Sequence, residues 1–295
     1  MPTPKSPALR YCGRTFSPVE LDSIRNLIVS NDEMKRAELS RQVCQLLNWL
    51  KPDGGLKDMS CRVAMLKMHR AGLIKLPPPR WGNGNGRRRP KLTSASEAQE
   101  IVSVSAGRLG ELEFLQVESR KDSSLWNELI ERHHYLGYDA LPGAQIRYLV
   151  FSGSRLLAAM GFGASAWKVA DRDSFIGWNA EQRAGNLHLI VNNARFLILP
   201  WIKCPNLASR LLSLAARRIG DDWEKRYNYR PVLLETFVDR ERFSGTCYRA
   251  ANWIRVGQTQ GRGKMDRYKE FSLPVKHIFV YPLRRNFHRL LCAPT

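Results

Sequence analysis

Cysteine, long apolar runs and a leader segment are scarce or missing in this sequence. The six cysteines in 295 residues include no CxxC pair and no cluster with histidine at zinc-ligand spacing, which argues against a structural zinc site. No stretch is long and apolar enough to insert into a membrane. The first residues lack the apolar segment of a signal peptide, so we expect a cytoplasmic protein with reduced thiols.

Acidic residues are also few. The chain has 47 Lys and Arg against 27 Asp and Glu, which gives a formal net charge of +20. The excess is +9 in residues 1–100 and +11 in the remainder, so the charge is not confined to one tail. This balance predicts a polyanionic partner, with DNA or another nucleic acid ahead of an anionic membrane. Hydrophobic residues make up 43% of the chain, which is enough for a substantial core.

Residues 1–92 are predicted to form a winged helix-turn-helix-like domain that binds nucleic acid. Apolar residues recur at helical spacing after Ser17-Pro18, over 37–49 and over 57–71. A short strand is expected at 73–76, and a glycine-rich basic stretch at 81–91 would be the wing. The alternative is a helical accessory module whose charged face is simply solvated.

The third helix of this domain would enter the major groove of DNA. Its apolar residues Met59, Val63 and Leu66 are expected to pack inward. The basic residues predicted to contact DNA from this helix and from the wing are Lys57, Arg62, Lys67, Arg87, Arg88 and Arg89. Residues 93–108 are rich in Ser, Ala and Glu and are predicted to be a linker.

Residues 109–295 are predicted to form an α/β (α+β) domain with a mixed sheet. Strand candidates lie at 112–117, 146–151, 155–162 and 277–281. Between them stands a central strand, helix and strand: an apolar run over 195–202, a helix from Leu207 to Gly220, and a buried strand over 232–238.

The turn within this central unit runs Lys203-Cys204-Pro205-Asn206-Leu207-Ala208. The order of strand, turn and helix resembles the Gcn5-related N-acetyltransferase (GNAT) fold, whose R/Q-x-x-G-x-G/A segment approaches the pyrophosphate of acetyl-CoA. Asn206 replaces a glycine and Pro205 has no N–H, so we expect the fold without the acetyl-CoA cofactor. The resemblance also places Tyr248 where many members keep a tyrosine that protonates the departing thiolate. An acetyl-CoA-dependent transferase is therefore an alternative function.

Longer sequence motifs in this half of the chain resemble those of the Druantia-type antiphage protein family DruA. They are RDSFIGW at 172–178, NNARFLILPW at 192–201, LLETFVD at 233–239, GTCYRAANW at 245–253 and GQTQGRG at 257–263. Members are also found beside transposase genes. The resemblance implies antiphage defence or a mobile element, with proteins of the defence system or a transposase as partners.

Four carboxylates are the main candidates for chemistry: Asp171, Asp173, Glu235 and Asp239. Carboxylates at strand ends and in a following loop can converge on one or two Mg²⁺ ions and activate water against a phosphodiester. Glu235 lies within an apolar strand, which marks either a site or a structural ion pair with Arg195. The predicted catalytic residues are Asp173, Glu235, Asp239 and Tyr248, for a nuclease or a base-removing hydrolase.

Several other residues have two interpretations each. His133 and His134 could act as acid or base, or could simply complete a helix end. Tyr248, Asn252 and Trp253 could stack on an unpaired base or belong to the core. A basic loop that would suit phosphate is formed by Gly257, Gly261, Arg262, Gly263 and Lys264. The sequence thus predicts a DNA-binding protein that processes DNA or is a non-catalytic recognition subunit.

Overall fold

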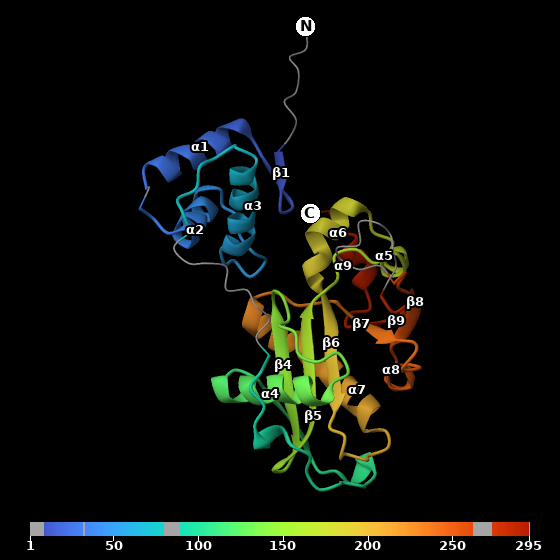
Figure 1. Ribbon diagram of the computed structural model, residues 1–295. Coiled ribbons are helices and arrows are strands. Elements are labelled where there is room, and N and C mark those ends of the chain that lie inside the picture. The colour runs from blue at the N-terminus through green and yellow to red at the C-terminus, as the bar shows by residue number, and fades with distance from the viewer. Residues whose placement is uncertain (1–8, 32, 80–88, 262–272, 295) are drawn as a thin grey trace. The chain divides into compact units, whose positions relative to one another are not determined.

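The computed structural model describes residues 9–31, 33–79, 89–261 and 273–294. The chain divides into two compact units, residues 1–87 and 88–295, each with its own hydrophobic core (Figure 1). The boundary falls within the basic stretch that was predicted to be the wing.

The first unit holds a small hairpin and three helices. The hairpin pairs β1 (Leu9–Tyr11) with β2 (Arg14–Phe16), and the helices are α1 (Pro18–Val29), α2 (Arg36–Leu46) and α3 (Asp58–Arg70). A capping box at the start of α1, in which Ser17 and Glu20 bond each other's backbone N–H groups, fixes the predicted helix start.

The inward face of α3 differs from the prediction. Met59 and Val63 are 61% and 44% exposed, whereas Cys61, Ala64, Met65 and Met68 are buried. The expectation that Met59 and Val63 pack inward was therefore wrong. Small side chains at Cys61 and Ala64 permit a close approach to α2, and this packing turns the larger Met59 and Val63 outward.

The strand expected at 73–76 is not formed. Side chains hold this segment instead: Arg25 Nε donates to Leu73 O at 2.9 Å, and Arg36 Nε donates to Pro77 O at 2.7 Å. Residues 80–88, which include most of the predicted wing, lie outside the described residues. The winged helix-turn-helix therefore stays a prediction.

The second unit is built on a seven-stranded sheet with the order β3-β4-β5-β6-β7-β9-β8. The strands are β3 (Leu112–Gln116), β4 (Gln145–Ser152), β5 (Arg155–Ala164), β6 (Ile190–Ile198), β7 (Leu233–Asp239), β8 (Ile254–Gln258) and β9 (Lys276–Pro282). Strands β6 and β7 pair in parallel and the other neighbours pair antiparallel. The predicted mixed α/β sheet is confirmed.

Two long helices cover opposite faces of this sheet. Arg147 on β4 bonds Asn127 of α4 (Arg120–His133), while the next residue, Tyr148, bonds Asp222 of α7 (Leu207–Tyr227). Successive residues of a strand point to opposite faces, so α4 and α7 lie on different sides. Among the helices that the structure describes, none combines the length and apolar character needed to cross a bilayer.

The described part of the second unit also has four shorter α-helices: α5 (Ala170–Ile176), α6 (Ala180–Asn186), α8 (Thr246–Ala250) and α9 (Phe287–Leu291). A small separate core, which includes Ile176, Val232 and Phe287, lies beneath α5 and α9. The sequence prediction missed α5, α6 and α9 because each is too short to display a helical period.

The predicted central unit is present as β6, α7 and β7, in the order for which the sequence resembles the GNAT fold. Asn206 stands at the start of α7 with φ of 64°, a left-handed conformation that asparagine tolerates better than most residues. Helix α7 continues to Tyr227, beyond the predicted end at Gly220.

Residues 93–108, expected to form a linker, pack on the second unit instead. Thr93 N donates to Glu128 Oε2 at 2.9 Å, and Val102 N donates to Trp201 O at 2.9 Å. Val102 and Ala106 are buried in the main core. A segment with such contacts is part of the folded unit, so this expectation is corrected.

Candidate functional site

The predicted catalytic residue Glu235 forms a buried ion pair. Arg172 Nη1 donates to Glu235 Oε2 at 2.7 Å, and neither side chain is exposed. Ala166 N donates to the other carboxylate oxygen, Oε1, at 2.8 Å. Both oxygens of Glu235 thus accept a hydrogen bond from the protein. Of the two interpretations of Glu235, a catalytic site or a structural ion pair, these contacts favour the structural ion pair.

Arg172 also joins Asp173 to this network. Arg172 Nη2 lies 2.7 Å from Asp173 Oδ1, and Arg183 Nη1 lies 3.4 Å from Asp173 Oδ2. Burial lowers the pKa of Arg172, but the Glu235 and Asp173 carboxylates outweigh burial, so the net pKa is raised. Asp173 lies on helix α5.

Arg195, the expected partner of Glu235, lies elsewhere. Its Nη1 donates to Ala194 O at 2.8 Å, and burial lowers the pKa of Arg195. The predicted pairing with Glu235 is therefore wrong. No sequence pattern points to Arg172, because it lies on a short helix without apolar periodicity.

The remaining two carboxylates, Asp239 and Asp171, accept hydrogen bonds in separate places. Asp239, at the end of β7, accepts a hydrogen bond from Glu241 N at 3.1 Å. Asp171 Oδ2 accepts one from Gln258 N at 2.8 Å and so fastens β8 to α5. Of the four carboxylates, only Asp173 and Glu235 are brought together, through Arg172. In the described part of the chain, no three Cys, His, Asp or Glu side chains are grouped as metal ligands.

Strands β6 and β7 separate and leave a pocket. They pair at three positions, ending with Asn192 opposite Glu235, although both strands continue beyond that point. The pocket has a volume of about 420 Å³. Its lining comes from the separated strands, from the loops after α4 and after β7, and from α8: His134, Tyr135, Leu136, Asn193, Ala194, Phe196, Ile198, Thr236, Phe237, Val238, Arg242, Phe243, Ser244, Gly245, Thr246, Cys247 and Tyr248.

The inner wall of the pocket is a closed polar cluster. Tyr248 OH donates to Asn193 Oδ1 at 2.8 Å, and Thr236 Oγ1 donates to Asn193 O at 3.0 Å. Burial raises the pKa of Tyr248, so the phenol stays protonated at neutral pH. Its proton is already donated to Asn193, which favours a structural role for Tyr248.

The mouth of the pocket carries an aromatic rim, formed by His134, Tyr135, Arg242 and Phe243. His134 stacks on Tyr135 at 4.9 Å, Tyr135 meets Phe243 edge-on at 5.5 Å, and the Arg242 guanidinium lies 5.2 Å from the Tyr135 ring. Tyr135 and Phe243 are 37% and 50% exposed. Exposed rings beside a guanidinium form a surface on which flat, electron-rich groups can stack.

The two predicted histidines have different surroundings. His133 Nε2 lies 2.8 Å from Ser96 O, and its ring packs edge-on against Trp201, so it serves the fold. His134 is held largely out of water, which lowers its pKa to about 4, with Arg195 adding to the effect. Because His134 Nδ1 accepts a bond from Leu136 N, the neutral ring carries its proton on Nε2.

Trp253 belongs to the core. It is buried and packs 5.1 Å from the Tyr248 ring, while Asn252 adopts a left-handed turn before β8. Tyr248 itself stacks on Phe279 at 5.7 Å. Tyr248 reaches the pocket, but neither Asn252 nor Trp253 lines it.

The basic residues predicted to bind DNA are only partly described. On α3, Lys67 and Arg70 are exposed, and Arg62 lies 3.4 Å from Asp58. Lys57 is half-buried before the helix, and Arg89 lies 3.7 Å from Glu131 in the second unit. The predicted contacts that fall outside the described residues are Arg87, Arg88, Arg262 and Lys264, together with Gly263.

The rim residues Tyr135, Arg242 and Phe243 are not among the site residues predicted from the sequence. Their signals were present as aromatic and basic residues in two polar loops, one after α4 and one after β7. The loops are about a hundred positions apart, and only the fold brings them together.

Comparison with known proteins gives one family and several similar structures. The sequence profile of the Druantia protein DruA family matches residues 68–272. No protein with a curated description matches the chain. An N-acetyltransferase from Staphylococcus aureus Mu50 has 11% identity and a TM-score of 0.36, over 59% of this chain and 99% of that one.

Two further solved structures are similar at the same level. A polyamine N-acetyltransferase from Drosophila melanogaster has 13% identity and a TM-score of 0.36, over 58% of this chain and 100% of that one. FeeM, an N-acyl amino acid synthase from uncultured soil microbes, has 11% identity and a TM-score of 0.36, over 59% and 90%.

Proposed function

The chain belongs to the Druantia protein DruA family, and we propose that it is a DNA-binding protein of antiphage defence whose second unit binds unpaired bases at the aromatic rim. Family membership supports the role in defence. The net charge of +20 supports a polyanionic partner, because phosphate neutralisation by Lys and Arg drives most non-specific binding to nucleic acid.

The observation that carries the proposal is the aromatic rim itself. Tyr135 and Phe243 are exposed side by side at the mouth of a pocket, with Arg242 held over the Tyr135 ring. Stacking of a base on an aromatic side chain contributes about 1–3 kcal/mol and tolerates any base. Inside the pocket, Phe196 and Ile198 offer apolar surface for a flat ring, whereas the phosphates would stay at the charged mouth.

The proposed activity is binding rather than hydrolysis. The Glu235 oxygens are occupied by Arg172 and by Ala166 N, and Asp173 is bound to Arg172 and Arg183. A carboxylate that activates water or holds Mg²⁺ needs an oxygen free for that ligand. Labelled single- and double-stranded DNA incubated with the protein, with and without Mg²⁺ and with an alkaline step, should remain intact. Strand cleavage that is lost in Glu235→Gln would restore the hydrolase hypothesis.

An acetyl-CoA-dependent transferase is the second candidate. One observation favours it: Tyr248 lines the pocket between β6 and β7, as the GNAT resemblance implies for a general acid. Three features oppose it, since Tyr248 donates to Asn193, Pro205 lacks an N–H, and Asn206 occupies a glycine position. Calorimetric titration with acetyl-CoA separates the two candidates: saturable binding favours the transferase.

Fluorescence anisotropy tests the proposal directly. The ligands are single-stranded DNA, a perfect duplex and a duplex with one unpaired base, each at several salt concentrations. Tyr135→Ala and Phe243→Ala should each weaken binding to the unpaired forms by about tenfold, from the loss of about 1–3 kcal/mol of stacking, with little effect on the perfect duplex.

Trp167→Ala is the matched control, because Trp167 is an aromatic residue 59% exposed that does not line the pocket. It should bind every ligand as wild type does. Equal losses of DNA affinity in Tyr135→Ala, Phe243→Ala and Trp167→Ala would exclude a specific role of the rim in binding. Absence of any DNA binding at low salt would overturn the proposal as a whole.

A further inference from the structure

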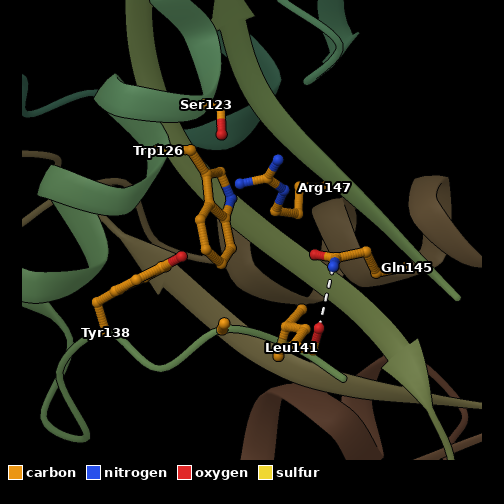
Figure 2. A pocket seen from close by; sticks show the side chains of 7 residues that line it. Ser123, Trp126, Tyr138, Leu141, Gln145 and Arg147 are labelled. Carbon is orange, nitrogen blue, oxygen red and sulfur yellow. Dashed lines mark hydrogen bonds between the residues drawn. The ribbon is translucent and has the colours of Figure 1, made fainter. Parts of the chain in front are cut away.

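A second, smaller pocket lies on the α4 face of the sheet. Its volume is about 140 Å³, and its walls are α4, the segment before β4, and β4 itself. The lining residues are Ser123, Trp126, Tyr138, Ala140, Leu141, Gln145 and Arg147 (Figure 2). Gly161 on β5 makes room for the indole, since a Cβ there would lie 2.9 Å from the Trp126 ring.

Arg147 is the central group of this pocket. Its guanidinium lies 5.3 Å from the Trp126 ring and toward Ser123 (Figure 2), and its Nη1 donates to Asn127 Oδ1 at 3.1 Å. Burial lowers the pKa of Arg147, Tyr138 opposes this effect, and Arg226 adds to it. No ion pair of Arg147 with a carboxylate occurs among the described residues.

Two hydroxyl groups beside Arg147 favour an anion. Ser123 and Tyr138 each have a hydroxyl that can donate, and in Figure 2 the Tyr138 hydroxyl points toward the same indole that Arg147 covers. Gln145 uses its Nε2 to donate to Leu141 O at 3.0 Å, so its amide is fixed in place. A guanidinium with hydroxyl donors and no carboxylate leaves a positive charge that an oxyanion would satisfy.

We propose that this pocket binds a phosphate group. Its volume of about 140 Å³ leaves room for one tetrahedral oxyanion. Arg147 would form charge-assisted hydrogen bonds to the phosphate oxygens, with Ser123 and Tyr138 as additional donors.

The phosphate could come from a free nucleotide or from the end of a nucleic-acid strand. The site does not depend on the aromatic rim, since the two pockets share no lining residue. The phosphate-site proposal therefore goes beyond the proposed function and can be tested independently of it.

Calorimetric titration of the full chain tests the site with four probes: inorganic phosphate, a deoxynucleoside 5′-monophosphate, and one short oligonucleotide with either a 5′-phosphate or a 5′-hydroxyl. Saturable binding of the two small probes assigns the site to free phosphate compounds. A tenfold or greater preference for the 5′-phosphorylated oligonucleotide assigns it to strand ends. Absence of both results overturns the proposal.

Variants locate the binding. Arg147→Gln should reduce phosphate affinity at least tenfold, and Arg155→Gln, an exposed arginine on β5, should not change it. Arg147→Gln could also loosen the fold, so Tyr138→Phe and Ser123→Ala are tested as well. Each of them removes one hydroxyl and keeps Arg147 over the Trp126 ring. Each should lower phosphate affinity severalfold. Wild-type affinity in all three pocket variants would overturn the proposal.

The two proposals fail in different ways. If the phosphate site is wrong but DNA binding is right, Arg147→Gln binds every oligonucleotide as wild type does. If DNA binding is wrong but the phosphate site is right, the small probes bind and the 5′-hydroxyl oligonucleotide does not.

Discussion

Arg172 and Glu235 stand 63 positions apart in the sequence, yet Arg172 Nη1 lies 2.7 Å from Glu235 Oε2, with both side chains shielded from water. The pair joins helix α5 to the central strand β7. Arg172 also donates to Ala166 O at 2.9 Å, so one guanidinium fixes the loop before α5, the helix and the strand. A residue chosen from the sequence as a catalytic candidate is therefore part of the framework.

Removing one member of this pair should destabilise the second unit. Glu235→Ala leaves the buried Arg172 charge with Asp173 as its remaining carboxylate partner, and losing one partner of a buried charge typically costs up to about 3–5 kcal/mol. Glu235→Gln keeps an acceptor and should cost less. Urea unfolding measures both, with Glu241→Gln, an exposed glutamate just after β7, as the control. If Glu235→Gln has wild-type stability but has lost DNA processing, Glu235 is catalytic instead.

His134 should make stability depend on pH. Burial lowers its pKa to about 4 from the ordinary value of 6.5, so between these values the unfolded chain binds a proton that the folded chain does not. Stability should therefore fall as pH decreases from 6.5 to about 4, by on the order of 2 kcal/mol. Urea unfolding at several pH values checks this. His134→Gln should remove that part of the dependence; an unchanged pH profile would contradict the assignment.

Two basic residues on α3 should contribute unequally to DNA binding. Lys67 is exposed and has no ion pair among the described residues, whereas Arg62 lies 3.4 Å from Asp58. Lys67→Ala should weaken binding to all sequences alike and reduce the slope of log affinity against log salt by about 1. Arg62→Ala should have a smaller effect because its charge is partly neutralised. Anisotropy titrations measure both; equal slopes for Lys67→Ala and wild type would exclude Lys67 from the interface.

Gly257→Ala should disturb the edge strand β8. A Cβ at this position would lie 1.9 Å from Asp171 Oδ2, so the side chain of Asp171 cannot keep its bond to Gln258 N. We expect a loss of stability of about 1–3 kcal/mol, as for overpacked sites. Gly110→Ala, just before β3, is the comparison, because Gly110 is not in the left-handed region and a Cβ there meets nothing within 4 Å. Adding Asp171→Ala should recover part of the loss in Gly257→Ala.

The central strands and helix were predictable because their sequence signal is local. The apolar runs before and after α7 and the helical spacing of Leu207, Leu211 and Ala215 fixed the order of β6, α7 and β7. The strand boundaries were predicted less accurately: β6 begins at Ile190, five positions before the predicted apolar run at 195–202.

The site was harder to predict because it depends on contacts between distant segments. Hydrophobicity alone does not separate Met59 from Met65 on α3, since only the packing against α2 decides which one is buried. In the same way, the sequence predicts Arg195 as the partner of Glu235, whereas the partner in the structure is Arg172 on α5, a helix too short to be seen in the sequence.

The brief pairing of β6 with β7 has a dynamic consequence. Three residue pairs, Ile190 with Leu233 through Asn192 with Glu235, and the bond from Val232 N to Leu189 O form the described backbone link between the four strands on one side and the three on the other. Amide hydrogens on the free edge of β6, over 193–198, should therefore exchange with solvent faster than those paired over 190–192. The two parts of the sheet should open as separate units, and a molecule bound between them would slow the exchange of both.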